Sequence, residues 1–136
     1  MSYLLNEVTK IVRSFRFAFR GIVNAFRSDH SFRLEVLLGT PVFSGIAWFL
    51  RPMTTVEVIL LWSAFLIILS VELLNTSIER LLDRLHPEEH ELIAVAKDIS
   101  AAAVLVAFLL AGLVVLLLCW SRIGPAAMMV VSAPYA

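Results

Sequence analysis

The sequence feature that most constrains the fold is a run of 22 residues without a charged side chain, from Ile99 to Trp120. A helix rises 1.5 Å per residue, so a helix of this length crosses the roughly 30 Å hydrocarbon core of a bilayer. The chain is 60% hydrophobic and 16% charged over 136 residues. A soluble domain of this length has too little interior to bury so much apolar surface. The run therefore predicts a membrane-spanning helix and argues against an ordinary soluble fold.

Two further apolar segments precede this run. The first, 34–50, carries one charged residue, Glu35, and its proline and glycines are tolerated in membrane helices that pack against neighbours. The second, 55–85, is apolar in its first half and polar in its second. We therefore expect an all-α protein with one membrane domain over 1–136. Its expected elements are membrane-spanning helices at 34–50, 55–85 and 91–121, followed by a tail, 122–136, to which no role is assigned.

The N-terminal segment 8–28 is predicted to be a basic amphipathic helix. Large apolar residues fall on one stripe, and arginines such as Arg13, Arg16 and Arg20 fall on the other side. This pattern is typical of a helix that lies in the plane of an anionic membrane surface. A soluble helix that binds a partner protein is the less favoured alternative.

The basic residues predict the orientation in the membrane. With three spans, the N-terminus and the connection between the second and third helices lie on one side. That side holds nine basic residues, six within the first 33 positions and three at Arg80, Arg84 and Lys97, whereas the other side holds two. Basic residues are enriched on the cytoplasmic side. We therefore expect the N-terminus and the polar 80–98 connection to face the cytoplasm.

Acidic residues gather where the helices meet this side. Four polar residues of the second helix lie on one helical face, because the last three follow the first by three, seven and eleven residues. An ionisable residue near membrane depth costs a few kcal/mol and usually marks function. For the last of the four, a solvated helix end is an equally good interpretation. The stripe is Glu72, Asn75, Glu79 and Asp83, and the neighbouring helices add Glu35, Lys97 and Asp98 at similar depth.

Several carboxylates with a nearby amide are hard oxygen ligands that suit Mg²⁺. A magnesium ion bound to a nucleotide needs only one or two of them, and another carboxylate could act as a general base. The set therefore suggests phosphoryl transfer to a lipid at the interface, although no Walker or kinase glycine-rich loop is present. A small ion-coupled transporter or channel is a rival hypothesis, but the acids cluster at one interface instead of crossing the midplane. A purely structural membrane-surface protein is a second rival, and it leaves the stripe unexplained.

Four strings in the chain carry a resemblance to a known family. They are FRLE (32–35), VELLNTSIE (71–79), LLDRL (81–85) and AKDISAAAVL (96–105). In this combination they resemble the prokaryotic diacylglycerol kinase family, in register over roughly residues 8–121. The resemblance implies a surface helix with three membrane helices and a homotrimer whose active sites combine residues of neighbouring subunits. It also implies a bacterial inner-membrane enzyme of phospholipid metabolism, which transfers the γ-phosphoryl group of ATP to diacylglycerol and so forms phosphatidic acid.

Matched positions suggest roles for individual residues. Glu72 resembles the catalytic base, and Glu35 and Glu79 resemble the pair that binds Mg²⁺. The expected nucleotide contacts are Lys10, Phe17, Glu35, Asn75, Glu79, Glu88, His90, Lys97 and Asp98. The expected lipid contacts are Phe15, Arg16, Phe19, Arg20 and Ala101.

Three positions depart from the family pattern. Lys10 stands where the best-known members carry arginine, Phe15 where they carry a small residue, and Ala101 where they carry serine. Lysine lacks the two-pronged geometry with which arginine holds phosphate. The departures bear on lipid choice, because a similar branch of the family phosphorylates undecaprenol instead. Glu35 within FRLE favours the diacylglycerol branch, and undecaprenol kinase remains the alternative.

Overall fold

The structure, a computed structural model, describes residues 2–85 and 90–132, and side chains within 6–85 and 90–123. Three of its helices are long and apolar enough to cross a membrane, at His30–Phe49, Thr55–Leu85 and Glu91–Ile123. The expected all-α architecture with an N-terminal amphipathic helix is confirmed. The elements are α1 (Ser2–Ser28), α2 (His30–Leu34), the π-helical turn η1 (Glu35–Gly39), α3 (Thr40–Phe49), α4 (Thr55–Leu85) and α5 (Glu91–Ser132).

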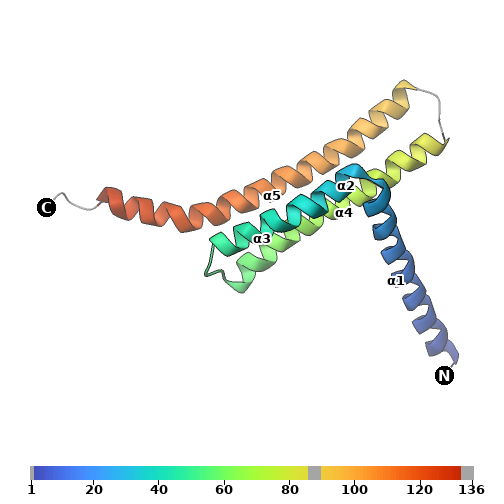
Figure 1. Ribbon diagram of the computed structural model, residues 1–136, viewed down its shortest axis with the longest axis horizontal. Coiled ribbons are helices and arrows are strands. Elements are labelled where there is room, and N and C mark those ends of the chain that lie inside the picture. The colour runs from blue at the N-terminus through green and yellow to red at the C-terminus, as the bar shows by residue number, and fades with distance from the viewer. Residues whose placement is uncertain (1, 86–89, 133–136) are drawn as a thin grey trace.

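The helices form an elongated bundle with one arm (Figure 1). The elements α2, η1 and α3 follow one another as a single rod beside α4, and α5 packs along α4. Helix α1 leaves this bundle at a steep angle. Helix α5 continues beyond the expected end at 121 as far as Ser132, since the alanine and methionine residues that follow Pro125 favour a helix.

Asp29 produces the change of direction between α1 and α2. Its backbone is extended, with φ of −106° and ψ of 127°, and its side chain accepts a hydrogen bond from the backbone N–H of Phe32 at 2.8 Å. A carboxylate in this position satisfies one of the free N–H groups at a helix start. A single residue therefore ends the surface helix and caps the first membrane helix.

The other end of the bundle is held by a polar clasp. The backbone N–H of Thr54 donates to Glu57 Oε2 at 2.7 Å, and the backbone N–H of Glu57 donates to Thr54 Oγ1 at 3.3 Å. This reciprocal pair is a capping box at the start of α4. Arg122 of α5 also donates to Glu57 Oε2 at 2.7 Å. Glu57 therefore joins α4 to α5 near this interface and is more than a solvated residue.

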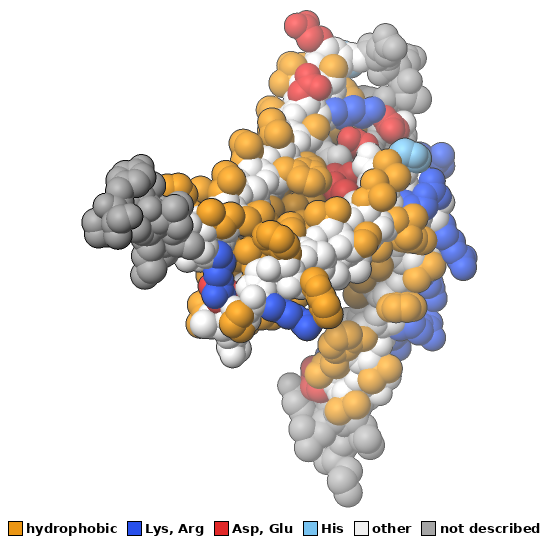
Figure 2. Space-filling model, turned by 60° about the vertical axis from the view of Figure 1, so that its left-hand side comes forward, with side chains coloured by type: hydrophobic (Ala, Val, Ile, Leu, Met, Phe, Trp, Pro, Cys, Tyr) orange, Lys and Arg blue, Asp and Glu red, His pale blue; other side chains and the backbone are white. Residues whose placement is uncertain are grey.

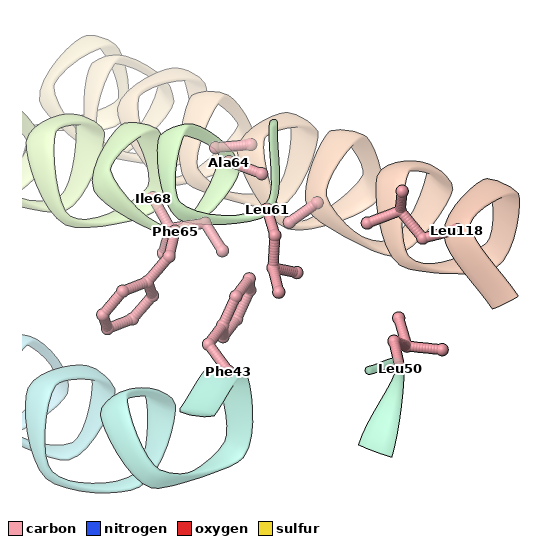
Figure 3. Packing of buried hydrophobic residues seen from close by; sticks show 9 residues of the cluster. Phe43, Leu50, Leu61, Ala64, Phe65, Ile68 and Leu118 are labelled. Atoms are coloured by element: carbon pink, nitrogen blue, oxygen red, sulfur yellow. The ribbon is translucent and has the colours of Figure 1, made fainter. Parts of the chain in front are cut away.

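The apolar core lies between these two polar ends (Figure 3). Leu61 and Ile68 of α4 are fully buried, and the rings of Phe43 and Phe65 stack with centroids 4.8 Å apart. Such a ring pair adds about 0.5–1.5 kcal/mol beyond the area it buries. Small residues allow α4 and α5 to approach closely, as is typical of membrane helices. They are Ala64, Ala107 and Ala111.

Gly39 lets the first membrane helix approach α4. A Cβ atom at this position would lie 2.5 Å from Cε2 and 3.0 Å from Cζ of Phe65. The Phe65 ring cannot move away easily, because it is buried and stacked on Phe43. At Gly45, by contrast, an added Cβ would meet nothing within 4 Å. The close packing of the rod on α4 therefore requires glycine at position 39.

This difference generates a matched test of the packing. We expect Gly39→Ala to destabilise the protein by about 1–3 kcal/mol through overpacking, and Gly45→Ala to be neutral or slightly stabilising, because alanine favours a helix. Thermal unfolding in detergent, followed by circular dichroism, measures both variants. Equal melting temperatures for the two variants would show that the close approach at Gly39 does not hold the bundle together.

Candidate functional site

The candidate site begins where the apolar core of α4 ends. Glu72 lies one turn after the fully buried Ile68 and is itself only 4% exposed. Asn75 follows on the same face at 8% exposed. Ionisable groups at such depth are costly unless the protein or a ligand interacts with them. The first two residues of the predicted stripe, Glu72 and Asn75, therefore face the interior of the bundle.

Glu35 reaches the same region from the first membrane helix. It opens the π-helical turn η1, a feature that is often found at functional sites. Its carboxylate lies within electrostatic range of Glu72 and Asp29, and its Oε2 atom is buried without a hydrogen-bond partner among the described residues. A buried carboxylate oxygen without a donor is a candidate ligand for a cation.

Asn75 connects the stripe to α5. Its amide oxygen accepts a hydrogen bond from the Ser100 hydroxyl at 2.6 Å, which directs its amide nitrogen to Glu79 Oε1 at 3.1 Å. Glu79 lies in turn within electrostatic range of Glu72. The amide therefore holds Glu79 in place while tying two membrane helices together.

Lys97 supplies a positive charge at the edge of the carboxylates. It forms an ion pair with Asp83 across α4 and α5, and it lies within electrostatic range of Glu79. Asp83 is therefore a partner of Lys97, which distinguishes it from a merely solvated helix end. Figure 2 shows acidic side chains gathered on this part of the surface with basic side chains beside them.

An apolar pocket adjoins Glu35. It has a volume of about 310 Å³ and lies between the first membrane helix, α4 and α5. Leu38 and Val42 line one side, and Ile68 and Phe108 line the other. Glu35 is the only charged residue among those that line it. The pocket therefore offers an apolar ligand a path that ends at a carboxylate.

The remaining predicted contacts on the bundle lie at its rim. Asp98 and Ala101 are exposed on α5. His90 is exposed just before α5, where its Nδ1 accepts a hydrogen bond from the backbone N–H of Leu92 at 3.2 Å. Glu88 lies outside the described residues.

The predicted contacts on α1 are separated from the carboxylates within one chain. Lys10 forms an ion pair with Glu7 at 2.7 Å, and the Arg20 guanidinium lies 5.7 Å from the centre of the Phe17 ring. Helix α1 carries these residues away from the bundle (Figure 1). Within one chain, Glu35 and Glu79 therefore each lie within electrostatic range of Glu72, whereas the α1 contacts lie apart. The exposed set on α1 is Lys10, Phe15, Arg16, Phe17, Phe19 and Arg20.

The donor set fits a magnesium ion that is bound together with a nucleotide. Within residues 2–85 and 90–132, no group of three or more His, Cys, Asp or Glu side chains could hold a metal by itself. Mg²⁺ in nucleotide sites uses one or two carboxylates and takes its other ligands from phosphate and water. Glu35, with its unpartnered oxygen, and Glu79 would provide such a pair.

Three polar residues of this region were missed by sequence reasoning. Asp29 lies within electrostatic range of both Glu35 and Glu72, and Ser100 orients Asn75. Thr76 is buried beside Asn75. Ser100 lies three residues after Lys97, so helical spacing could have indicated it. Asp29 carries only the general signal of an aspartate before a helix.

Comparison with known proteins agrees with this geometry. Residues 16–119 match the model of the family described as prokaryotic diacylglycerol kinase. The diacylglycerol kinases of Haemophilus influenzae and Escherichia coli K12 are each 33% identical to the chain, over 82% and 85% of it and 93% of their own lengths. The undecaprenol kinase of Bacillus subtilis is 33% identical over 74% of the chain and 80% of its own length. This chain belongs to the prokaryotic diacylglycerol kinase family.

Proposed function

We propose that this protein is an ATP-dependent lipid kinase that phosphorylates diacylglycerol to phosphatidic acid. The observation that carries the proposal is a buried carboxylate, Glu72, within electrostatic range of Glu35, which lines an apolar pocket. An acyl chain can occupy such a pocket from the lipid phase, while its hydroxyl group remains near the carboxylates. The names of the relatives support the same activity and substrate.

In the proposed reaction, the oxygen of the lipid hydroxyl attacks the γ-phosphorus of ATP while Glu72 accepts the hydroxyl proton. The bond from the γ-phosphorus to the bridging oxygen breaks, and ADP leaves. A bound Mg²⁺ would neutralise negative charge on the phosphates. Glu35 and Glu79 would hold that ion, and Asn75 keeps Glu79 in position. Lys97, anchored by Asp83, would lie near the nucleotide. Phosphoryl transfer of this kind depends mainly on positioning and electrostatics.

We further propose that the site opens to the cytoplasm of a bacterial inner membrane. Residues 2–85 and 90–132 include three helices able to cross a membrane. A chain with three spans would place nine of its eleven basic residues on the side of the carboxylates. Basic residues are enriched on the cytoplasmic side, where ATP is available. Both considerations support the same orientation.

A homotrimer with composite sites is part of the proposal. Large apolar side chains such as Leu66, Leu109 and Leu116 are exposed on α4 and α5 and can pack against lipid or other subunits. The predicted nucleotide contacts of α1 lie away from the carboxylates of their own chain. Neighbouring subunits would supply the missing side of each site.

Undecaprenol is the alternative acceptor. The matched undecaprenol kinase covers a smaller share of this chain than the two diacylglycerol kinases do, which favours diacylglycerol. A proton-coupled transporter or channel fits less well, because 22 uncharged residues of α5 offer no charged path across the membrane.

The role of Glu72 as the base is tested by Glu72→Gln. We expect turnover to fall about 10²–10⁴-fold, because a neutral amide of the same shape cannot accept the proton. Transfer of γ-labelled phosphate from ATP to diacylglycerol in mixed micelles measures turnover, and circular dichroism verifies folding. Glu91→Gln is the matched control, since it makes the same change at an exposed carboxylate of α5 that is not among the predicted contacts, and it should retain most activity. Near-normal turnover in a folded Glu72→Gln protein would contradict the assignment.

The proposed metal ligands are tested by Glu35→Gln and Glu79→Gln. Each should raise the Mg²⁺ concentration for half-maximal turnover about tenfold or more, because each removes one charged oxygen ligand. Electron paramagnetic resonance of Mn²⁺, titrated with a non-hydrolysable ATP analogue, measures metal binding without turnover. Glu91→Gln again serves as the control. Unchanged metal binding in both variants would exclude these carboxylates as ligands.

A further inference from the structure

A second pocket lies on another side of α4, where α1 meets the bundle. It has a volume of about 530 Å³ and is lined by residues of α1 and α4. Figure 1 shows where α1 joins the bundle. Ala18 and Ile22 of α1 and Leu73 of α4 supply apolar lining, whereas Asn24, Thr76, Ser77 and Arg80 supply polar lining. None of these residues is one of the site carboxylates or of their hydrogen-bond partners. We call this space the α1–α4 pocket.

Thr76 indicates that the α1–α4 pocket has a polar occupant. The residue is 4% exposed, and its hydroxyl has no hydrogen-bond partner among the described residues. A buried hydroxyl without a partner costs about 1–3 kcal/mol. Since Thr76 lines the pocket, a hydrogen-bonding group placed there would remove this cost.

Arg80 indicates that the occupant is an anion. Its Nη2 atom donates to the Ser28 hydroxyl at the end of α1, which holds the guanidinium at the pocket. Within the described part of the chain, no carboxylate forms an ion pair with it. An arginine without a carboxylate partner presents several donors that match the geometry of phosphate.

The surroundings favour a phospholipid over a dissolved ion. Helix α1 has an apolar face with Ile22 and Phe19 exposed and a basic opposite face, so it is suited to the plane of the headgroups. Apolar and polar side chains line the pocket together. A glycerophospholipid matches both kinds of lining. Its phosphate can contact Arg80, and its glycerol and upper acyl carbons can contact the apolar side chains.

We propose that the α1–α4 pocket binds the phosphate-bearing headgroup of an anionic glycerophospholipid. Arg80 pairs with the phosphate, and the Thr76 and Ser77 hydroxyls can donate to its oxygens. The bound lipid joins α1 to α4 next to the segment that carries Asn75 and Glu79. This pocket shares no lining residue with the apolar pocket at Glu35, and the proposal does not depend on the identity of the phosphorylated lipid.

The proposal is tested on the full-length protein in detergent by native mass spectrometry with phosphatidylglycerol. We expect saturable binding that Arg80→Gln weakens about tenfold, because a charge-assisted contact is lost. Arg84→Gln removes the same charge one turn further along α4, outside the pocket, and should weaken binding less than about twofold. Equal loss in the two variants, or no saturable binding, would overturn the proposal.

Thr76→Val separates binding from folding. Valine has nearly the same shape, and the hydroxyl has no partner to lose, so the melting temperature without lipid should not fall. Binding of phosphatidylglycerol should nevertheless weaken several-fold. A lower melting temperature with unchanged binding would show that the hydroxyl is only structural. Inorganic phosphate is tested as a competing ligand. If it displaced phosphatidylglycerol at equal concentration, the occupant would be free phosphate and the lipid assignment would be wrong.

Discussion

The burial of the Glu72 carboxyl group among apolar helices is the constraint on which the structure depends. Placing an ionisable group at membrane depth costs a few kcal/mol, and that cost must be met by neighbouring polar groups or by a ligand. Here the neighbours are themselves mostly acidic, since Glu35, Glu79 and Asp29 lie within electrostatic range of one another or of Glu72. Such a group of acids is unfavourable alone and becomes favourable with a cation among them. The resting structure is therefore suited to receive a metal-bound nucleotide.

The apolar packing places these acids with precision. Gly39 allows the first membrane helix to touch Phe65, and the stacked rings of Phe43 and Phe65 fix its position along α4. This packing also positions the Glu35 carboxyl group, because Glu35 lies one turn before Gly39. Between α4 and α5, the Asn75–Ser100 hydrogen bond and the Lys97–Asp83 ion pair hold the polar ends together. The Glu57–Arg122 pair does the same at the opposite end of the bundle.

The sequence predicts those features that depend on helix geometry alone. The placement of Glu72 and Asn75 on one face of α4 follows from their spacing along a helix. The sequence places Glu35 at a depth similar to that of Glu72, and in the structure the two carboxylates lie within electrostatic range of each other. The roles of Gly39, Ser100 and Thr76 could not be predicted, since each depends on what another helix places opposite it. The direction of α1 likewise depends on one backbone torsion pair at Asp29.

Phosphoryl transfer to a lipid by this membrane bundle can be measured directly. The purified protein is incubated in mixed micelles with Mg²⁺ and ATP labelled at the γ-phosphate, with diacylglycerol in one sample and undecaprenol in another. Labelled phosphatidic acid, formed faster than labelled undecaprenyl phosphate, is the expected result. If neither lipid acquires label, converging carboxylates at the membrane surface serve some other purpose, and the protein is not a lipid kinase.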